Sequence, residues 1–391
     1  MKKLILKILF FFLLFKLPVF PEKFKLNYSD LDKYELKFFG DYRVYLNGKY
    51  QGLNIRNIKG ILNVSKYADN LKIEGVVYHL KKTIRGSSTI GFEVDKFESC
   101  SFILTNDGQF KNSSNILFPP LLGIPYFPDK DLGVGDVYEN YGKAAVTFFN
   151  SDDTGLLEII AATQYKGKKE YMGKIFDYFE ISYRYGRVLE GDNIESARGR
   201  HNLSLLFDNN TGKPYYMIDR FEEEFDLKNG DKLKHKGFYN YFYKLIVPMK
   251  KDELMTELKK DTDRELLNDL DFKKKKEGIS ITINNLKFKP DSTELLETEV
   301  EKLKKLLSIL LKIEDRSFLI VGHTALAGTE KTRMQLSLDR AKTIADFLIN
   351  NGISGDRILF TGKGATEPVA PNDTEENMQK NRRVEIIILE D

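Results

Sequence analysis

The first long stretch of the chain, from about Phe24 to Ile246, interleaves short apolar runs with turn residues. Many of the apolar positions are aromatic or β-branched, which favours strands over helices. Asn47-Gly48 stands between the runs Tyr42–Leu46 and Lys49–Leu53, an arrangement typical of a hairpin with a two-residue turn. The pattern therefore predicts an N-terminal β-rich domain.

Later segments of this stretch alternate strictly. Every second residue from Phe179 to Tyr185 is apolar or aromatic, with polar residues between, and Tyr239–Leu245 repeats the pattern. Such alternation predicts strands with one buried face. The proline-rich segment 118–130 suggests a crossing, and with it the alternative of two subdomains. We expect an all-β domain over residues 24–249, either a barrel or a sandwich.

An outer-membrane barrel is an alternative for the same residues. Against it, Glu222-Glu223-Glu224 and Lys168-Lys169-Glu170 place charge on both faces of their strands. A charge facing lipid near the midplane costs about 2–4 kcal/mol. A soluble domain is therefore favoured. A ligand-carrying cavity is a further alternative, but it is less favoured because aromatic-rich strands more often fill a core.

The composition changes at residue 250. Residues 250–277 are highly charged and predict a helical linker that ends in the basic run Lys273–Lys276. This run could contact phosphate or an acidic membrane surface. The solvated end of the linker helix is favoured, because lysines also suit the C-terminal end of a helix dipole.

Residues 278–391 alternate strand-like and helix-like segments. Leucines recur at intervals of three and four from Leu296 to Leu310, and a second such helix ends near Asn351-Gly352. The four strand-like segments are Ile279–Ile283, Phe318–Val321, Ile358–Thr361 and Val384–Leu389. Together they predict helices on one face of a mixed sheet. The expected fold class is thus an α+β multidomain protein: an all-β module, a helical linker and a C-terminal α/β sandwich.

Composition excludes several kinds of site. The 391 residues carry 61 Lys+Arg against 58 Asp+Glu, too even a balance for a protein built to neutralise a nucleic-acid backbone. Cys100 is the one cysteine, so an intrachain disulfide and a thiolate metal site are excluded. The four histidines are far apart in sequence, which argues against a metal site built from them. No catalytic constellation emerges, and we expect neither enzyme activity nor a cofactor.

The extreme N-terminus is typical of an export signal. Lys2 and Lys3 precede the apolar run Ile8–Phe15, which is too short to cross a bilayer, and prolines follow at Pro18 and Pro21. We expect a signal peptide over residues 1–21. The end of this segment lacks the small residues of a good cleavage site, so an uncleaved anchor remains an alternative.

Five ordered motifs lie in the last 110 or so residues. They are Phe288-Lys289-Pro290-Asp291-Ser292 with Leu295, Gly322-His323-Thr324 with Gly328, Leu336–Ala341, Gly362-Lys363-Gly364 with Pro368 and Asn372, and Asn381-Arg382-Arg383-Val384-Glu385. In order and spacing, residues 278–391 resemble the OmpA-like domain, the peptidoglycan-associated module of OmpA, Pal and MotB proteins.

The resemblance implies a site for a diamino acid of the peptidoglycan stem peptide. That ligand end is a zwitterion, which needs an anion for its ammonium and a cation for its carboxylate. The cation of the family motif is kept as Arg340, whereas the acid corresponds to Ala325 and is lost. The residues carried over into this degenerate pocket are Lys289, Thr324, Ala325, Arg333, Arg340 and Arg382.

The substitutions make the pocket more cationic. Arg333 stands where binders have an asparagine, and Lys289 stands where they have an aspartate. An ornithine ligand does not explain this pattern, because ornithine keeps the ammonium that needs the missing acid. A carboxylate, a phosphate or an acidic partner suits the pocket better. Arg340 also has a structural interpretation, as the ion-pair partner of Asp291 or Glu330.

We therefore expect a non-enzymatic cell-envelope protein, located at the periplasmic face of the outer membrane or in the periplasm. Its peptidoglycan binding should be weak or absent, and its partner could instead be an anionic or protein component of the envelope. Two alternatives remain: a functional peptidoglycan tether, and an interaction or ligand-carrier module that acts through the β domain.

Overall fold

The computed structural model describes residues 21–82, 91–105, 109–113, 118–147, 154–188, 194–262, 266, 268–284, 286, 288 and 295–391. The first twenty residues of the expected signal peptide lie outside this set, so the signal stays a prediction. Among the helices in the described ranges, none is both long and apolar enough to span a bilayer.

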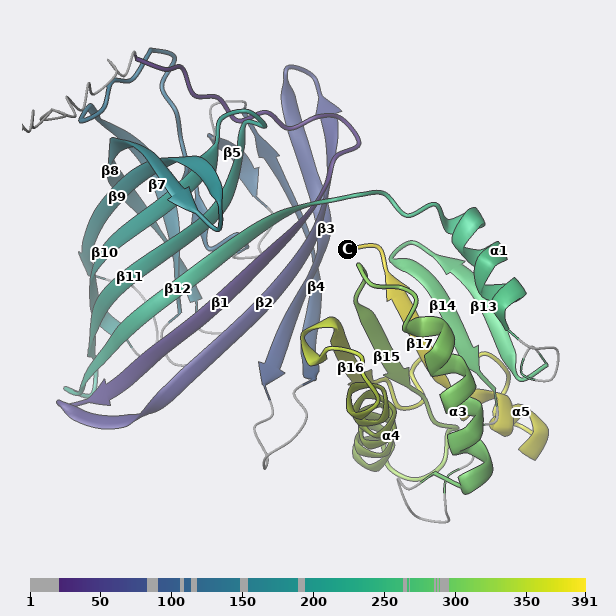
Figure 1. The fold of residues 1–391 in the computed structure, drawn as a ribbon. Coiled ribbons are helices and arrows are strands. Elements are labelled where there is room, and N and C mark those ends of the chain that lie inside the picture. The colour runs from purple at the N-terminus through teal and green to yellow at the C-terminus, as the bar shows by residue number, and fades with distance from the viewer. Residues whose placement is uncertain are drawn as a thin grey trace, which may run out of the picture.

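The N-terminal part consists of strands that form one continuous antiparallel sheet (Figure 1). The strands are β1 (Lys33–Leu46), β2 (Lys49–Tyr67), β3 (Asn70–Lys82), β4 (Phe92–Leu104), β5 (Phe110–Ser113), β6 (Leu121–Leu122), β7 (Val137–Thr147), β8 (Thr154–Tyr171), β9 (Lys174–Val188), β10 (Ile194–Asp208), β11 (Lys213–Leu227) and β12 (Lys232–Ile246). The β-rich prediction is confirmed. The described strands make a single strongly curved sheet rather than the two separate sheets of a sandwich.

Most neighbours in this sheet are consecutive in the chain, with one long-range exception. Strand β1 pairs with β12 along its full length, from Lys33 opposite Ile246 to Leu46 opposite Leu233. Its other edge pairs with β2 through the predicted hairpin. Asn47 and Gly48 at that turn have φ of 49° and 78°, the left-handed values that a two-residue turn of this kind requires.

One apolar core fills the inner face of the curved sheet. The proline-rich segment contributes Phe118, Ile124 and Phe127, which are buried among side chains from strands on both sides of it. Strands before and after residues 118–130 therefore share one core. This arrangement differs from the two subdomains that the prolines suggested, because the segment packs into the core instead of bridging two of them.

A group of titratable side chains is buried in the same core. His201 Nδ1 lies 2.8 Å from Asp219 Oδ2, and Tyr185 donates a 2.8 Å hydrogen bond to Glu223. Glu223 also lies 3.4 Å from His201 Nε2 and 3.8 Å from His235 Nδ1. Burial alone lowers the pKa of His201, but the two carboxylates outweigh it and raise this pKa to about 9.

The predicted linker is only partly helical. Helix α1 (Lys251–Asp261) is followed by strand β13 (Leu270–Lys275), so the basic run lies on a strand and its turn rather than at a helix end. This segment is a strand because it pairs with β14 (Gly278–Ile283) at the edge of the C-terminal sheet. Lysines of the run already have acidic partners, with Lys273 2.7 Å from Asp271 and Lys274 paired with Asp252.

The C-terminal part has the predicted alternation of strands and helices. After β14 come α3 (Glu297–Leu310), β15 (Phe318–Gly322), α4 (Glu330–Asn350), a short 3-10 helix (Gly355–Arg357), β16 (Ile358–Gly362), α5 (Glu375–Asn381) and β17 (Val384–Leu389). Its strands lie in the order β13-β14-β17-β15-β16, with β15 and β16 parallel and the other pairs antiparallel. Helices α3 and α4 pack on one face over a core that includes Leu303, Ile344 and Ile386.

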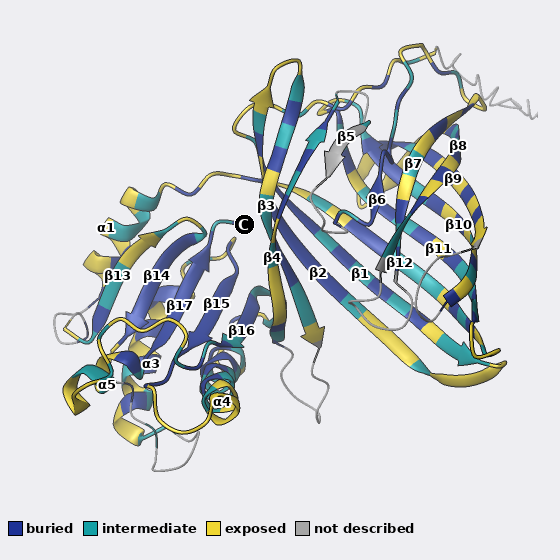
Figure 2. Ribbon diagram, turned by 180° about the vertical axis from the view of Figure 1, so that it is seen from behind, coloured by how far each residue is buried: buried dark blue, intermediate teal, exposed yellow. Residues whose placement is uncertain are grey.

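The other face of the C-terminal sheet packs against the N-terminal sheet. Leu319, Leu359 and Ile387 form a buried cluster with Ile61 and Tyr78 of strands β2 and β3. Residues of β16 also pair in parallel with the start of β4, so the two sheets are joined (Figure 2). The sequence pattern did not predict this interface.

Candidate functional site

Helix α4 carries the retained cation of the motif. Thr329 caps the helix, accepting a 3.2 Å hydrogen bond from the Thr332 backbone N–H. Further along, the Arg340 guanidinium lies 4.8 Å from the centre of the Phe288 ring. Burial, followed by the charge of Arg382, lowers the pKa of Arg340. Its Nε is buried and has no hydrogen-bond partner in the described part of the chain.

Two glycines let the ends of strands β15 and β16 approach this helix closely. A Cβ at Gly322 would lie 2.0 Å from the Ser337 carbonyl oxygen, and one at Gly362 would lie 2.4 Å from the Leu338 nitrogen. Ser337 Oγ accepts a 2.8 Å hydrogen bond from the Gly364 backbone N–H. The glycine and serine positions of the motifs thus fix the strand ends against α4.

The loop after β15 carries Ala325, the position at which the sequence predicts a lost acid. Ala325 is buried, and the preceding Thr324 donates its backbone N–H to the Gly364 carbonyl at 2.8 Å. The Thr324 hydroxyl is buried without a hydrogen-bond partner among the described residues. Asn372 then accepts a 2.9 Å hydrogen bond from the Leu326 backbone N–H. The loop is therefore anchored on both sides of Ala325.

Two other arginines of the predicted pocket are already engaged. Arg333 donates from Nη1 to the Gly328 carbonyl, and Arg382 pairs with Glu375 at the start of α5. The contact of Arg333 is with a neutral carbonyl and leaves its charge uncompensated, whereas Glu375 compensates the charge of Arg382. The sequence did not reveal these local contacts. A contact with a backbone carbonyl does not depend on residue type, and the position of Glu375 beside Arg382 depends on the fold.

A buried charge cluster lies under the same loops. Arg383 donates a 2.8 Å bond to Glu385, and Lys275 of β13 lies 2.5 Å from the same carboxylate. Burial would raise the pKa of Glu385, but these cations and His323 lower it to about 2. Burial and Arg383 together lower the pKa of His323 to about 4, so this imidazole is neutral at pH 7. Both of its ring nitrogens are buried without a hydrogen-bond partner among the described residues.

Asn381, the first residue of the last motif, organises a further loop. Its side-chain oxygen accepts hydrogen bonds of 2.8 and 3.0 Å from the backbone N–H groups of Val369 and Ala370. Its Nδ2 donates a 3.0 Å bond to Asn372. Asn381 is fully buried, so its motif position is structural.

The predicted pocket residues are thus distributed over three elements. Thr324 and Ala325 lie on the loop after β15, Arg333 and Arg340 on α4, and Arg382 follows α5. Lys289 lies outside the described residues. Within those residues Arg340 forms no ion pair, so Glu330 does not hold it, and Asp291 also lies outside them.

Residues 287–382 match the sequence model of the OmpA family. This segment is an OmpA family domain. The chain shares 36% identity over 109 residues with the peptidoglycan-binding protein ArfA of Mycobacterium tuberculosis, covering 28% of this chain and 33% of that protein. It shares 36% identity over 101 residues with outer membrane protein A of Bordetella avium, covering 26% and 48%. The chain therefore spans about a third to a half of the length of these relatives.

Two solved structures are similar to part of the chain. An outer membrane protein from Borrelia burgdorferi is 33% identical, with 31% of this chain and 96% of that chain covered and a TM-score of 0.26. The cell wall anchor of the T6SS from Pseudomonas aeruginosa is 24% identical, with 36% and 96% covered and a TM-score of 0.30.

Proposed function

We propose that this protein is a non-enzymatic cell-envelope protein whose OmpA domain binds diaminopimelate-type peptidoglycan weakly or not at all. The relatives named above are a peptidoglycan-binding protein and an outer membrane protein, which supports a place in the envelope, at the outer membrane or in the periplasm. The observation that carries the proposal is the buried Ala325 on the loop after β15, where the family motif has an acid.

An alanine at this position removes the partner of the ligand ammonium. A hydrogen bond to a charged group contributes about 1.5–3 kcal/mol, and the Ala325 methyl group offers neither charge nor acceptor. Since about 1.4 kcal/mol corresponds to a tenfold change in affinity, the substitution weakens binding at least about tenfold.

Arg340 supports residual recognition of the carboxylate end. Its Nε is buried without a hydrogen-bond partner in the described chain, and its guanidinium is held over Phe288. A guanidinium suits a carboxylate because it can donate two parallel hydrogen bonds. The site therefore keeps the cationic half of a zwitterion site and lacks the anionic half.

The test is cosedimentation of the full chain with purified diaminopimelate-containing peptidoglycan. We expect the native chain to stay largely in solution and Ala325→Asp to pellet. Ala325→Asn is the matched control, because it adds the same volume without charge and should behave like the native chain. Thermal unfolding of each variant checks that the buried substitution leaves the fold intact.

Two results would contradict the proposal. If the native chain pellets as well as Ala325→Asp, the protein is an ordinary wall tether and the missing acid is irrelevant. If Ala325→Asp and Ala325→Asn both stay folded and neither pellets, the position does not control wall binding.

A further inference from the structure

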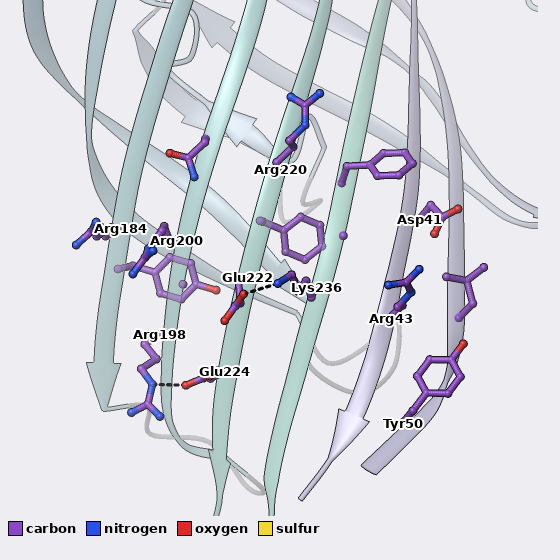
Figure 3. Close-up of a pocket in the computed structure, with 17 residues that line it drawn as sticks. Asp41, Arg43, Tyr50, Arg184, Arg198, Arg200, Arg220, Glu222, Glu224 and Lys236 are labelled. Carbon is purple, nitrogen blue, oxygen red and sulfur yellow. Dashed lines mark hydrogen bonds and ion pairs between the residues drawn. The ribbon is translucent and has the colours of Figure 1, made fainter. Parts of the chain in front are cut away.

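The exposed face of the N-terminal sheet holds a cavity of about 1060 Å³, formed by strands β9 to β12 with β1 and β2 (Figure 3). Six cationic and three acidic side chains line it. The cations are Arg43, Arg184, Arg198, Arg200, Arg220 and Lys236, and the acids are Asp41, Glu222 and Glu224. This excess contrasts with the near-even charge balance of the whole chain.

The strand register places several of these charges in one row. Arg184 lies opposite Arg200, and Arg200 lies opposite Glu222 on the next strand. Glu222 lies opposite Lys236, which in turn lies opposite Arg43. Adjacent strands are about 4.8 Å apart, so the row extends about 19 Å across the sheet.

Two cross-strand pairs in this row have like charges. Arg184 faces Arg200, and Lys236 faces Arg43, and like charges directly opposite destabilise a sheet. The fold alone gives no reason for either pair, since any neutral polar residue suits an exposed strand position. An anionic ligand that bridges them would relieve both repulsions.

The acids of the cavity are already shared among other cations. Glu222 lies 2.5 Å from Lys234 and 3.3 Å from Lys236. Glu224 lies 2.8 Å from Arg198 and 3.2 Å from Lys234. Figure 3 shows the Glu222–Lys236 and Glu224–Arg198 contacts as dashed lines.

The other arginines of the cavity have no such partners. In the described ranges, no hydrogen bond or ion pair involves the exposed side chains of Arg43, Arg184, Arg200 and Arg220. Asp41 is the one remaining acid of the cavity for these four guanidinium groups, which face a space too large for one small ion. Arginine presents planar, forked donors that match phosphate oxygens.

We propose that this arginine face binds a ligand carrying at least two phosphate groups, held between Arg184 and Arg200 at one end and by Arg43 at the other. The same chemistry could be presented by a free phosphorylated sugar or by a phosphorylated lipid headgroup. The inference is independent of the OmpA domain, because every residue of the arginine face belongs to the N-terminal sheet.

The test measures binding of the full chain to inositol hexakisphosphate by isothermal titration calorimetry. Phosphatidylcholine vesicles with and without phosphatidic acid form the second arm. Arg184→Gln/Arg200→Gln should raise the dissociation constant at least tenfold, about 1.4 kcal/mol. Lys72→Gln/Lys81→Gln is the control, because it removes the same charge from two β3 lysines outside the cavity and should change binding much less.

The outcomes are distinct. Binding to inositol hexakisphosphate but not to vesicles supports the free ligand, and binding only to vesicles with phosphatidic acid supports the headgroup. The proposal fails if neither probe binds, in which case an acidic protein surface becomes the candidate. It also fails if both double variants weaken binding equally, since binding then reflects net charge rather than the arginine face.

Discussion

Lys59 of β2 and Asp391, the last residue of the sequence, form a buried ion pair between the two sheets. Lys59 also donates a 2.8 Å hydrogen bond to Ser317 and lies 2.9 Å from Glu35. Burial would lower the pKa of Lys59, but Asp391 and Glu35 outweigh it and raise this pKa. The ammonium therefore remains charged at the domain interface.

Replacing this lysine should strongly destabilise the protein. Lys59→Met leaves Asp391 buried without its cation and leaves Glu35 paired only with the exposed Lys37, and breaking a buried pair in this way costs about 3–5 kcal/mol. Urea unfolding at pH 7 measures the loss. Lys72→Met is the control, because Lys72 pairs with Glu74 at an exposed site and should cost at most about 1 kcal/mol. Equal losses of unfolding free energy for the two variants would show that the buried pair contributes no more stability than the exposed one.

The buried His201 predicts a loss of stability at alkaline pH. Its pKa is raised to about 9 in the folded protein by Asp219 and Glu223, against the burial that lowers it, from an ordinary value of 6.5. The stabilisation is therefore fully present below pH 6.5 and is lost as pH rises through about 9. The expected decrease in the free energy of unfolding is on the order of 3 kcal/mol.

Urea unfolding between pH 6 and 9.5 measures this decrease. His201→Gln should be less stable at pH 6 and should show a flatter profile, because the titrating group is gone. A variant profile as steep as the native one would place the titration elsewhere in the protein. The facing tyrosines Tyr183 and Tyr185 do not interfere, since burial raises their pKa values out of this range.

The close approach of β15 to α4 predicts that Gly322 tolerates no side chain. In Gly322→Ala the Cβ would meet the Ser337 carbonyl oxygen at 2.0 Å, so backbone must move, and overpacking of this kind costs about 1–3 kcal/mol. Gly186→Ala is the matched control, because nothing lies within 4 Å of its Cβ position. Thermal unfolding compares the two. Equal melting temperatures would mean that the strand end shifts without cost.

Arg340 and Arg333 should differ in their effect on wall binding. In an Ala325→Asp background, Arg340→Gln should return the chain to solution in the peptidoglycan assay, since the ligand carboxylate then lacks its guanidinium. Arg333→Gln in the same background should pellet nearly as well, because Arg333 is engaged with the Gly328 carbonyl. If Arg333→Gln returned the chain to solution and Arg340→Gln did not, Arg333 rather than Arg340 would bind the ligand carboxylate.

The sequence predicted the elements whose signals are local. The Asn47-Gly48 turn, the helix around Ala341 and the strand Phe318–Val321 depend on neighbouring residues, and the structure confirms them. Strand β13 was predicted as helix because its lysines suit a helix end, whereas pairing with β14 decided its conformation. The pairing of β1 with β12 joins residues some 200 positions apart and has no local signal.

The candidate site was predictable to a similar extent. The ordered motifs located Ala325 and Arg340, and the structure adds that the first is buried and that the second stacks on Phe288. The engagement of Arg333 and Arg382, and the like-charge row at Arg184 and Arg200, required three-dimensional register. Whether the pocket is degenerate stays a prediction until the wall assay is done.

The packing of the OmpA sheet against β2 and β3 determines how far apart two ligands can be held. Because one face of that sheet is buried against the N-terminal domain, α4 and the arginine face are separated by a packed interface rather than by a linker alone. If both sites are occupied at once, the protein acts as a spacer. The distance between the two ligand-bearing surfaces is then determined by the folded domains and not by the length of a flexible linker.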